Sequence, residues 1–198
     1  MSGPPRSTNV VWQRGIERER RWAALGHGGA TVWMTGLPAS GKSTVAAAVE
    51  ERLLAQGRNA YVLDGDNLRH GLNGDLGFSA GDRAENVRRT AEVSALLADA
   101  AVVVLVALVS PYRADRAAAR AAHDRRGLPF VEVHVATTLE ECERRDPKGL
   151  YARARAGELK GMTGVDDPYE PPEAPDVVVG GDTPLDEAVA RVLAALPD

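Results

Sequence analysis

An eight-residue segment early in the chain constrains its fold more than any other feature. Residues 36–43 read Gly-Leu-Pro-Ala-Ser-Gly-Lys-Ser, which matches the pattern G-x-x-x-x-G-K-[ST]. An apolar run at residues 31–35 comes directly before the segment, and a helical pattern at 43–56 comes directly after it. A glycine-containing turn between a strand and a helix directs backbone N–H groups inward, where they can surround a phosphate group. The sequence therefore predicts a local phosphate-binding site.

The residue types in this segment suit the binding of a nucleoside triphosphate. Gly36 and Gly41 let the backbone close around an anion, and Lys42 carries a compact positive charge that reaches the β- and γ-phosphates. The hydroxyl group of Ser43 is expected to ligate magnesium. We predict that the ATP-binding residues of this segment are Gly36, Ala39, Ser40, Gly41, Lys42, Ser43 and Thr44, and that Lys42 is also catalytic.

Beyond this segment, apolar runs of strand length alternate with helical patterns. The apolar runs lie at residues 31–35, 59–63, 102–109, 130–135 and 177–179, and the helical patterns lie at 43–56, 82–99, 115–126, 139–145 and 184–196. Such alternation is typical of a parallel sheet that is covered by helices on both faces. The sequence thus predicts an α/β protein with a mostly parallel, twisted sheet.

Length and composition limit the chain to one such domain. With 198 residues, of which 44% are hydrophobic, the chain can bury one sizeable core. Residues 1–29 are expected to form an N-terminal arm and linker, because they begin with polar and proline residues, continue with clustered arginines and end in glycines. Residues 30–198 are expected to form the domain. The stretch 146–175 fits neither periodic pattern except for a faint helical patch around 150–156, and long stretches of this kind are often functional.

Three helices carry recognisable end signals. Asp82 followed by Glu85, and Thr138 followed by Glu141, have the spacing of a capping box, in which the first side chain caps the helix and the second reaches back. Gly57 is placed to end its helix in the left-handed conformation. These signals predict helix starts near residues 82 and 138.

Charge and cysteine content narrow the possible functions. A net charge of −4 argues against binding of polymeric nucleic acid, whose affinity depends on clustered positive charge. The single cysteine, Cys142, cannot form an internal disulfide, and the first residues lack the apolar core of a signal peptide. The longest apolar run, at residues 100–109, is too short to span a membrane. We therefore expect a cytoplasmic protein that contacts no membrane.

The ends of two strands indicate the kind of nucleotide-binding protein. Many switch and motor proteins carry a metal-organising aspartate at the end of a very apolar strand, but the 102–109 run continues as Ser-Pro-Tyr-Arg. The 61–63 run instead ends in Asp64-Gly65-Asp66-Asn67. Carboxylates at the end of a strand lie where an open α/β sheet binds its ligands. This arrangement favours a small-molecule kinase over a GTPase.

A kinase also needs an acceptor site beside the phosphates. The stretch after the two aspartates offers guanidinium groups for an anion, one aromatic ring for stacking and one amide, carried by Arg69, Phe78, Arg83, Asn86, Arg88 and Arg89. For Arg88 and Arg89 a solvated helix face is the favoured interpretation, because neighbouring arginines on a helix usually point outward.

Four segments carry a more specific pattern than the phosphate-binding segment alone. They read DGDNLRHGLNGDLGFS at 64–79, SPYR at 110–113, RDPKGLY at 145–151 and GMTGVDDPYE at 161–170. Together they resemble the adenylylsulfate (APS) kinase family, over about residues 11–179. Members of this family transfer the γ-phosphate of MgATP to the 3'-hydroxyl of adenosine 5'-phosphosulfate (APS), which gives 3'-phosphoadenosine 5'-phosphosulfate (PAPS) and ADP. The resemblance implies the three-layer fold of P-loop kinases, usually as a homodimer.

The resemblance also implies roles for individual residues. Asp66 would contact the acceptor 3'-hydroxyl as a general base or as the group that orients it, and Asp64 would help Ser43 to hold hydrated magnesium. Ser110 is interpreted as a binding residue, because direct transfer between two nucleotides needs no phosphoryl carrier. Arg69, Arg83 and Asn86 would bind the phosphosulfate, and Phe78 would stack on the adenine. The full set of implied acceptor-binding residues is Asp66, Arg69, Phe78, Arg83, Asn86, Ser110, Lys148, Leu150 and Met162.

Residues 146–161 match a mobile lid in this family. Arg145, Lys148 and Lys160 would neutralise charge on the bound nucleotides when the lid closes, and Arg145 is assigned to ATP. The family pattern usually reads Gly-Phe-Thr-Gly where this chain has Met162, and a thioether stacks less rigidly on a purine than a phenyl ring does. Two alternatives therefore stay open. The acceptor is another 5'-substituted adenosine, or the chain is a catalytically weak nucleotide-binding subunit that its N-terminal arm attaches to a sulfate-activating complex.

Overall fold

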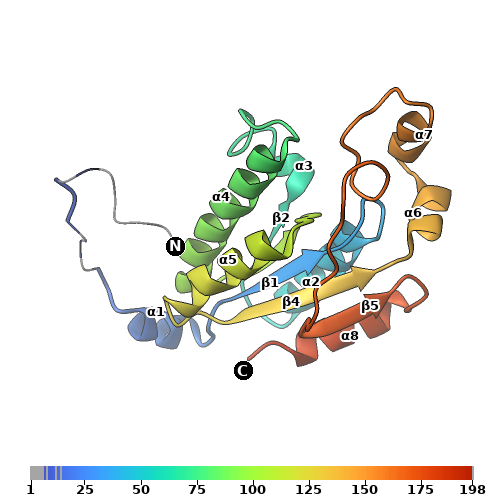
Figure 1. Ribbon diagram of the computed structural model, residues 1–198. Coiled ribbons are helices and arrows are strands. Elements are labelled where there is room, and N and C mark those ends of the chain that lie inside the picture. The colour runs from blue at the N-terminus through green and yellow to red at the C-terminus, as the bar shows by residue number, and fades with distance from the viewer. Residues whose placement is uncertain (1–6, 8, 12, 14, 198) are drawn as a thin grey trace.

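Five parallel strands form one sheet in the order β2-β3-β1-β4-β5 (Figure 1). The computed structural model describes residues 7, 9–11, 13 and 15–197; the other positions of the expected N-terminal arm lie outside the described residues. The strands are β1 (Ala30–Thr35), β2 (Ala60–Asp64), β3 (Val103–Ala107), β4 (Phe130–Ala136) and β5 (Val177–Gly180). The predicted parallel sheet is confirmed.

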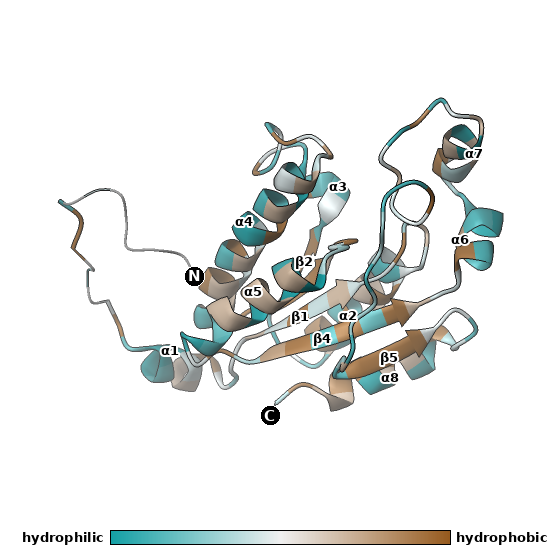
Figure 2. Cartoon of the chain, in the orientation of Figure 1, coloured by the Kyte–Doolittle hydropathy of each residue, from teal (hydrophilic) through white to brown (hydrophobic). Residues whose placement is uncertain are grey.

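Helices cover both faces of the sheet and complete the three layers (Figure 1). They are α2 (Lys42–Ala55) and α8 (Leu185–Ala194) on one face, and α4 (Ala80–Asp99) and α5 (Arg113–Asp124) on the other. Because successive side chains of a strand point to opposite faces, Val32 packs under α2 and α8 while Trp33 packs under α4 and α5. Figure 2 shows the result as largely hydrophobic strands between helices of mixed hydropathy. The strands are therefore buried on both faces, as their continuous apolar runs predict.

The strand order brings the carboxyl ends of β1, β2 and β3 to one edge of the sheet. Asp64, at the end of β2, is aligned with Ala107 at the end of β3, and Ala107 is aligned with Met34 in β1. From β1 the chain passes through α2 to β2 on one side, whereas β4 lies on the other side of β1. Such a reversal of direction opens a crevice outside the carboxyl ends of the strands. The phosphate-binding segment and the two aspartates lie at this crevice.

Four shorter helices complete the described chain: α1 (Arg18–Leu25), α3 (Gly65–Leu68), α6 (Leu139–Arg145) and α7 (Leu150–Arg155). Arg18 and Arg21 pair with the carboxylate of Asp99 at the end of α4, and Trp22 Nε1 donates to Asp99 O (3.1 Å). These contacts hold α1 against the domain. No helix in the described part of the chain is both long enough and apolar enough to cross a membrane.

One of the two predicted helix caps is wrong. α4 begins two residues before the predicted start, and its N-cap is Ser79, whose Oγ accepts the Asp82 N–H (3.1 Å). The same hydroxyl donates to Asp82 Oδ2 (2.7 Å), so the Asp82 side chain bonds the cap residue and lies within the first turn of α4. The second predicted capping box is confirmed in part: Thr138 Oγ1 accepts the Glu141 N–H (3.3 Å), but the Glu141 carboxylate pairs with Arg144 and Arg145.

Candidate active site

The phosphate-binding segment forms the turn between β1 and α2. Gly41 has φ +108°, a conformation that side chains rarely allow, and a Cβ on Gly36 would lie 2.5 Å from Val135 O. Both positions therefore require glycine. Because the N-cap of α2 is Gly41, no capping side chain occupies the helix N-terminus, and its first N–H groups can serve an anion.

Lys42 lies under this turn and is almost completely buried. Its Nζ donates to Leu37 O (2.8 Å), Gly36 O (3.0 Å) and Ser40 Oγ (3.3 Å), and the residue is 8% exposed. Burial lowers the pKa of Lys42 from its ordinary 10.5 to about 8, although the nearby carboxylates of Asp64 and Asp66 oppose the change. At neutral pH the side chain is thus largely charged in a buried site, where its attraction to phosphate is stronger than at the surface.

Ser43 and Asp64 form the polar pair that best fits a hydrated magnesium ion. Ser43 Oγ donates to Asp64 Oδ2 (2.6 Å), and Asp64 Oδ1 accepts the Asp66 N–H (2.9 Å), which fixes the carboxylate. Adjacent ligands at ~2.1 Å from an octahedral ion lie about 3 Å apart, close to the observed oxygen separation. Among the described residues, no group of three or more His, Cys, Asp or Glu side chains could hold a metal ion. One hydroxyl and one carboxylate suit magnesium, which keeps several waters and substrate phosphate oxygens as ligands.

Asp66 lies at the start of α3, two residues after Asp64 of the Ser43–Asp64 pair. Its Oδ2 contacts Nζ of Lys148, which comes from the predicted lid, 82 residues later in the sequence. Both side chains are mostly exposed, with 66% exposure for Asp66 and 60% for Lys148. Both ends of this ion pair are therefore accessible to a ligand.

One cavity of about 720 Å³ joins these groups to the predicted acceptor residues. Its lining includes Ala39, Gly41, Lys42, Ser43 and Thr44 of the phosphate-binding segment, Asp64, Asp66 and Ser110 at the strand ends, Arg69, Phe78, Arg83 and Asn86 of the acceptor stretch, and Arg145, Lys148, Leu150 and Met162 beside or within the lid. Gly36 and Ser40 shape the turn but are not part of this lining. The remaining predicted site residues thus meet in one place.

Phe78 is the exposed ring at the acceptor end of the cavity. It is 63% exposed, and the Arg69 guanidinium carbon lies 4.1 Å from the ring centroid. Arg83 Nε donates to Phe78 O (3.0 Å), while its two terminal nitrogens donate to Thr163 Oγ1 (2.9 Å) and Gly161 O (2.6 Å). Arg83 therefore connects the Phe78 segment to the far side of the cavity.

Asn86 faces the same cavity from α4. Its Oδ1 accepts from Nδ2 of Asn73, a fully buried side chain. Because this bond uses the acceptor of the Asn86 amide, the group that Asn86 can offer to a ligand is its NH2 donor. A donor in this position suits an anionic ligand.

Ser110 is held in an unusual conformation at the end of β3. Its φ is +39°, and its Oγ accepts from Trp33 Nε1 (3.1 Å) and donates to Leu108 O (3.4 Å). The residue is 4% exposed. The hydroxyl thus already has protein partners, which agrees with a structural or binding role better than with a phosphoryl carrier.

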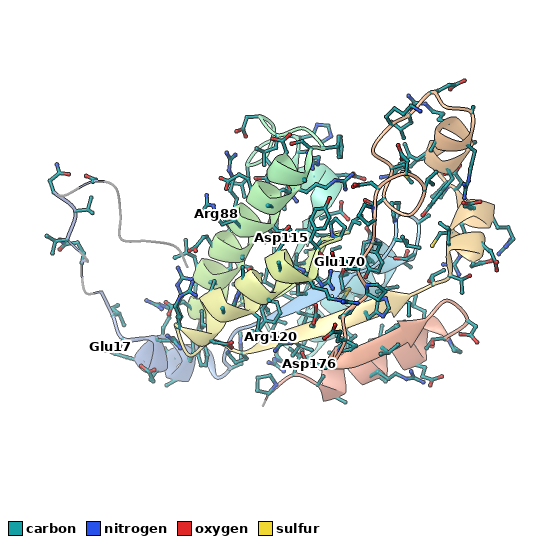
Figure 3. The ribbon with its side chains drawn as sticks, viewed as in Figure 1. Glu17, Arg88, Asp115, Arg120, Glu170 and Asp176 are labelled. Atoms are coloured by element: carbon teal, nitrogen blue, oxygen red, sulfur yellow. The ribbon has the colours of Figure 1, made fainter. Side chains whose placement is uncertain are left out.

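Arg145 lies beside the phosphate-binding segment, whereas Arg88 and Arg89 lie on α4 outside the cavity lining. Arg145 donates to Gly181 O (2.9 Å) and Ser40 O (3.4 Å). Arg88, labelled on α4 in Figure 3, and Arg89 pair with Glu85 and hold the pKa of that carboxyl at about 2. Neither arginine belongs to the cavity lining, and the interpretation as a solvated helix face is confirmed for Arg88, whereas Arg89 is half-buried and bonds Leu72 O and Asp75.

A model of the adenylylsulphate kinase family matches residues 28–180. The chain belongs to this family. The adenylyl-sulfate kinase of Emericella nidulans is 50% identical over 194 residues, which cover 94% of each chain. The solved structure of the APS kinase CysC of Mycobacterium tuberculosis in complex with AMPPNP and APS has a TM-score of 0.83 and 55% identity, and the match covers 85% of this chain and 97% of that one. A hexameric APS kinase from Thiobacillus denitrificans has a TM-score of 0.61 and 29% identity over 98% of this chain and 38% of that one.

This adenylylsulphate kinase family member buries Met162 in a small apolar cluster. Met162 is 6% exposed and packs with Cys142 and Tyr151, and the cluster also contacts Leu37 and Ala39 of the phosphate-binding segment. Tyr151 OH donates to Pro38 O (3.0 Å), a second link between α7 and that segment. The side chain that departs from the family pattern thus forms part of the packing beneath the predicted lid as well as of the cavity lining.

Several residues of the site were not singled out from the sequence. Asn73, Thr163 and Trp33 position Asn86, Arg83 and Ser110 through single hydrogen bonds. Asn73 and Thr163 lie within the segments that resemble adenylylsulphate kinases, so the motifs contain them without revealing their partners. Trp33 lies in the core strand β1, and an apolar run gives no signal for the one polar atom that it carries.

Proposed function

We propose that this protein is an adenylylsulfate kinase, which transfers the γ-phosphate of ATP to the 3'-hydroxyl of APS and releases PAPS and ADP. The observation that carries the proposal is the single cavity that joins Lys42 and Ser43 to Asp66 and Phe78. Donor phosphates and an acceptor nucleoside can meet there at the carboxyl ends of the strands. The M. tuberculosis relative, with 55% identity, is described in complex with an ATP analogue and APS.

The proposed transfer is direct. The 3'-oxygen of the acceptor attacks the γ-phosphorus, the bond between that phosphorus and the β,γ-bridging oxygen breaks, and the hydroxyl proton passes to a carboxylate oxygen of Asp66. Lys42 neutralises charge on the β- and γ-phosphate oxygens. Such transfer depends mainly on positioning and on charge stabilisation. Since Lys148 contacts Oδ2 of Asp66, the acceptor hydroxyl displaces Lys148 from that oxygen.

Magnesium is the proposed cofactor. Bound with ATP, it supplies neutralisation of the charge that develops on the phosphate oxygens. Ser43 and Asp64 are the residues that would hold it, since their oxygens lie 2.6 Å apart and the Asp66 N–H fixes the carboxylate. Asp66 itself stays available to the acceptor hydroxyl.

Residues 146–161 act as a lid over the two nucleotides in this proposal, and Lys148 and Leu150 bring that lid to the acceptor. Residues 1–29 form an arm and linker before the kinase domain 30–198. A homodimer in the cytoplasm is the proposed state. Since the T. denitrificans relative is described as hexameric, sedimentation velocity of the full chain is the measurement that distinguishes a dimer from a larger assembly.

The same fold and the same transfer would serve another 5'-substituted adenosine. Met162 favours this second candidate, because it packs with Cys142 and Tyr151 and brings a thioether, not an aromatic ring, to the cavity lining. A less rigid surface over the acceptor adenine gives weaker selection of that nucleoside.

The deciding experiment supplies MgATP with APS, AMP or adenosine and separates the products by anion-exchange chromatography. We expect rapid formation of PAPS, with a kcat/KM for APS at least about a hundredfold above that for AMP, because the phosphosulfate binds the arginines. Equal values for APS and AMP would refute the proposed acceptor, and ATP binding without turnover would identify a catalytically weak subunit.

Two matched variants test the role of the Asp66 carboxylate. Asp66→Asn should lose most turnover and keep the binding of ATP. Asp75→Asn, in the same stretch but paired with Arg89 outside the cavity lining, should retain turnover within about twofold. Unchanged turnover in Asp66→Asn would remove Asp66 from the mechanism.

A further inference from the structure

Two irregular segments form part of the cavity wall at its acceptor end. Ser110 and Pro111 come from the turn after β3, and residues 161–163 come from the loop between α7 and β5. Apart from one isolated β-bridge between Thr163 and Asp167, neither segment belongs to a helix or a strand. Ser110 also has the strained φ of +39°, which persists only where surrounding contacts fix it. The side chains that hold these segments therefore decide the shape of the acceptor end.

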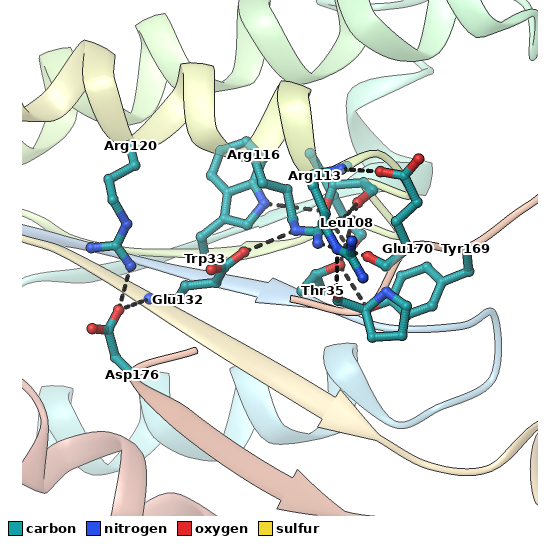
Figure 4. Close-up of polar contacts among 12 residues, drawn as sticks. Trp33, Thr35, Leu108, Arg113, Arg116, Arg120, Glu132, Tyr169, Glu170 and Asp176 are labelled. Carbon is teal, nitrogen blue, oxygen red and sulfur yellow. Dashed lines mark hydrogen bonds and ion pairs between the residues drawn. The ribbon is translucent and has the colours of Figure 1, made fainter. Parts of the chain in front are cut away.

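Arg116, on α5, bonds both segments with one guanidinium group. Its Nη1 donates to Ser110 O (2.7 Å), and its Nη2 donates to Glu170 O (2.7 Å), at the base of the 161–170 loop. Its Nε donates to Glu132 Oε1 (2.8 Å) on β4, which balances the charge (Figure 4). The Arg116 side chain is 2% exposed. Three bonds from a planar, buried group to three elements define one arrangement of those elements.

Further bonds hold the 169–170 segment to the same strand ends. The Glu170 N–H donates to Pro111 O (2.9 Å), and Tyr169 OH lies 3.1 Å from Thr35 Oγ1. Figure 4 shows Arg116 extending from α5 toward Glu132, with Glu170 and Tyr169 beside it. The turn after β3 and the base of the loop are thus one connected unit, with the guanidinium at its centre.

Contacts within the 161–170 loop connect Glu170 to the residues that line the cavity. Asp166 accepts the N–H groups of Gly161 (2.9 Å) and Met162 (2.7 Å), so residues 161–166 form one compact turn. Thr163 in turn accepts from Arg83, which also bonds Phe78 O. A shift of Glu170 therefore moves the part of the loop that faces the acceptor.

We infer that Arg116 is a positioning residue for the acceptor nucleotide, because it fixes the Ser110 turn and the 161–170 loop relative to each other. This inference rests on the proposed function. Arg116 makes no hydrogen bond or ion pair with Lys42, Ser43 or Asp64, whose positions depend on β1, α2 and β2. Its loss therefore affects the acceptor and leaves the ATP phosphates in place.

The test is Arg116→Lys, measured by steady-state kinetics with APS and ATP varied separately. Lysine keeps the charge beside Glu132 but has one nitrogen, which cannot bond both carbonyls and the carboxylate in a planar arrangement. We expect the KM for APS to rise about tenfold or more, with a lower kcat, and the KM for ATP to stay within about twofold. Arg120→Lys is the matched control, because Arg120 lies on the same helix and bonds Phe130 O and Asp176, away from the cavity. It should leave both KM values within about twofold.

Several kinetic outcomes overturn the inference. They are equal changes in the two KM values of Arg116→Lys, the absence of any change, or a change as large in Arg120→Lys. An inactive wild-type enzyme with APS would instead refute the proposed function, so the two failures are distinguishable.

If Arg116→Lys does not fold, amide hydrogen exchange of the wild-type protein tests whether the Ser110 turn and the 161–170 loop respond to the acceptor together. APS should slow exchange in peptides covering 108–112 and 168–172 together, whereas AMPPNP should leave both nearly unchanged. Protection of one peptide without the other, or equal protection by AMPPNP, would overturn the inference. Failure of APS to bind at all would refute the proposed function.

Discussion

Replacement of Lys42 by methionine tests whether the phosphate-binding segment keeps its charge in a desolvated site. Burial lowers the pKa of Lys42 from 10.5 to about 8. At about 1.4 kcal/mol per pH unit, folding disfavours the charged form by about 3 kcal/mol below pH 8. Methionine removes this cost. It also removes the hydrogen bonds to Gly36 O and Leu37 O, and each lost bond cancels about 1 kcal/mol of the gain in stability. The variant should therefore be about 1 kcal/mol more stable than the wild type at pH 7.

The sign of this difference is expected to reverse with pH. In the unfolded chain the lysine keeps its ordinary pKa of 10.5, so between pH 8 and 10.5 the unfolded state binds more protons than the folded state. The free energy of unfolding of the wild type therefore rises across this window relative to Lys42→Met. Between pH 7 and pH 10 the change in the difference amounts to about 2.5 kcal/mol. At pH 10 the wild type should thus be the more stable protein by about 1.5 kcal/mol.

Urea denaturation followed by circular dichroism at pH 7, 8, 9 and 10 measures this difference. Lys160→Met is the matched control, because it makes the same substitution at an exposed lysine. Binding of an ATP analogue should be lost in Lys42→Met at every pH. A stability difference between wild type and Lys42→Met that is independent of pH would show that the ammonium is not desolvated, and would refute the reasoning.

Three further substitutions test other contacts of the structure. Ser79→Ala should lower the free energy of unfolding by about 1 kcal/mol in urea, because it removes the N-cap of α4, whereas an unchanged value would favour the Asp82 cap. Met162→Ala should cost about 2–4 kcal/mol in the same assay, since it opens a space beside Cys142 and Tyr151, and a loss below about 0.5 kcal/mol would mean that Met162 is not packed there. Lys148→Ala should change Tm by less than about 1 °C, because its ion pair with Asp66 is exposed, while kcat falls about tenfold or more; an unchanged kcat would exclude Lys148 from charge neutralisation.

The parts of the fold that have a local cause are those that the sequence predicts correctly. Strand runs such as 130–135 are apolar along their length because both faces of a parallel strand are buried, and this pattern is visible without partners. The N-cap of α4 was placed wrongly because Ser79 and Asp82 are both good capping residues, and only the start of the helix decides between them. Within the stretch 146–175, the faint helical patch around 150–156 is confirmed as α7, whereas side-chain contacts of Asp166 with the 161–162 N–H groups, which no local pattern predicts, hold the 161–166 turn.

The sequence also locates most of the candidate site, because its chemistry depends on residue types at fixed spacing. Gly36, Gly41, Lys42 and Ser43 lie within one turn, so their cooperation follows from local geometry. The roles of the acceptor residues came from a family resemblance, and they remain predictions for the substitutions above to test.

Sequence alone determined the phosphate-binding turn, the parallel sheet around it and the pair of aspartates at the end of the next strand along the chain, since each is specified by residues close together in the chain. Only the tertiary structure decided that Lys148 lies against Asp66, that Asn73 orients Asn86, and that Arg116 joins the turn at Ser110 to the loop at Glu170. These contacts bridge up to 82 residues of sequence. Which distant side chains meet depends on how the whole sheet and its helices pack, and no local pattern encodes that packing.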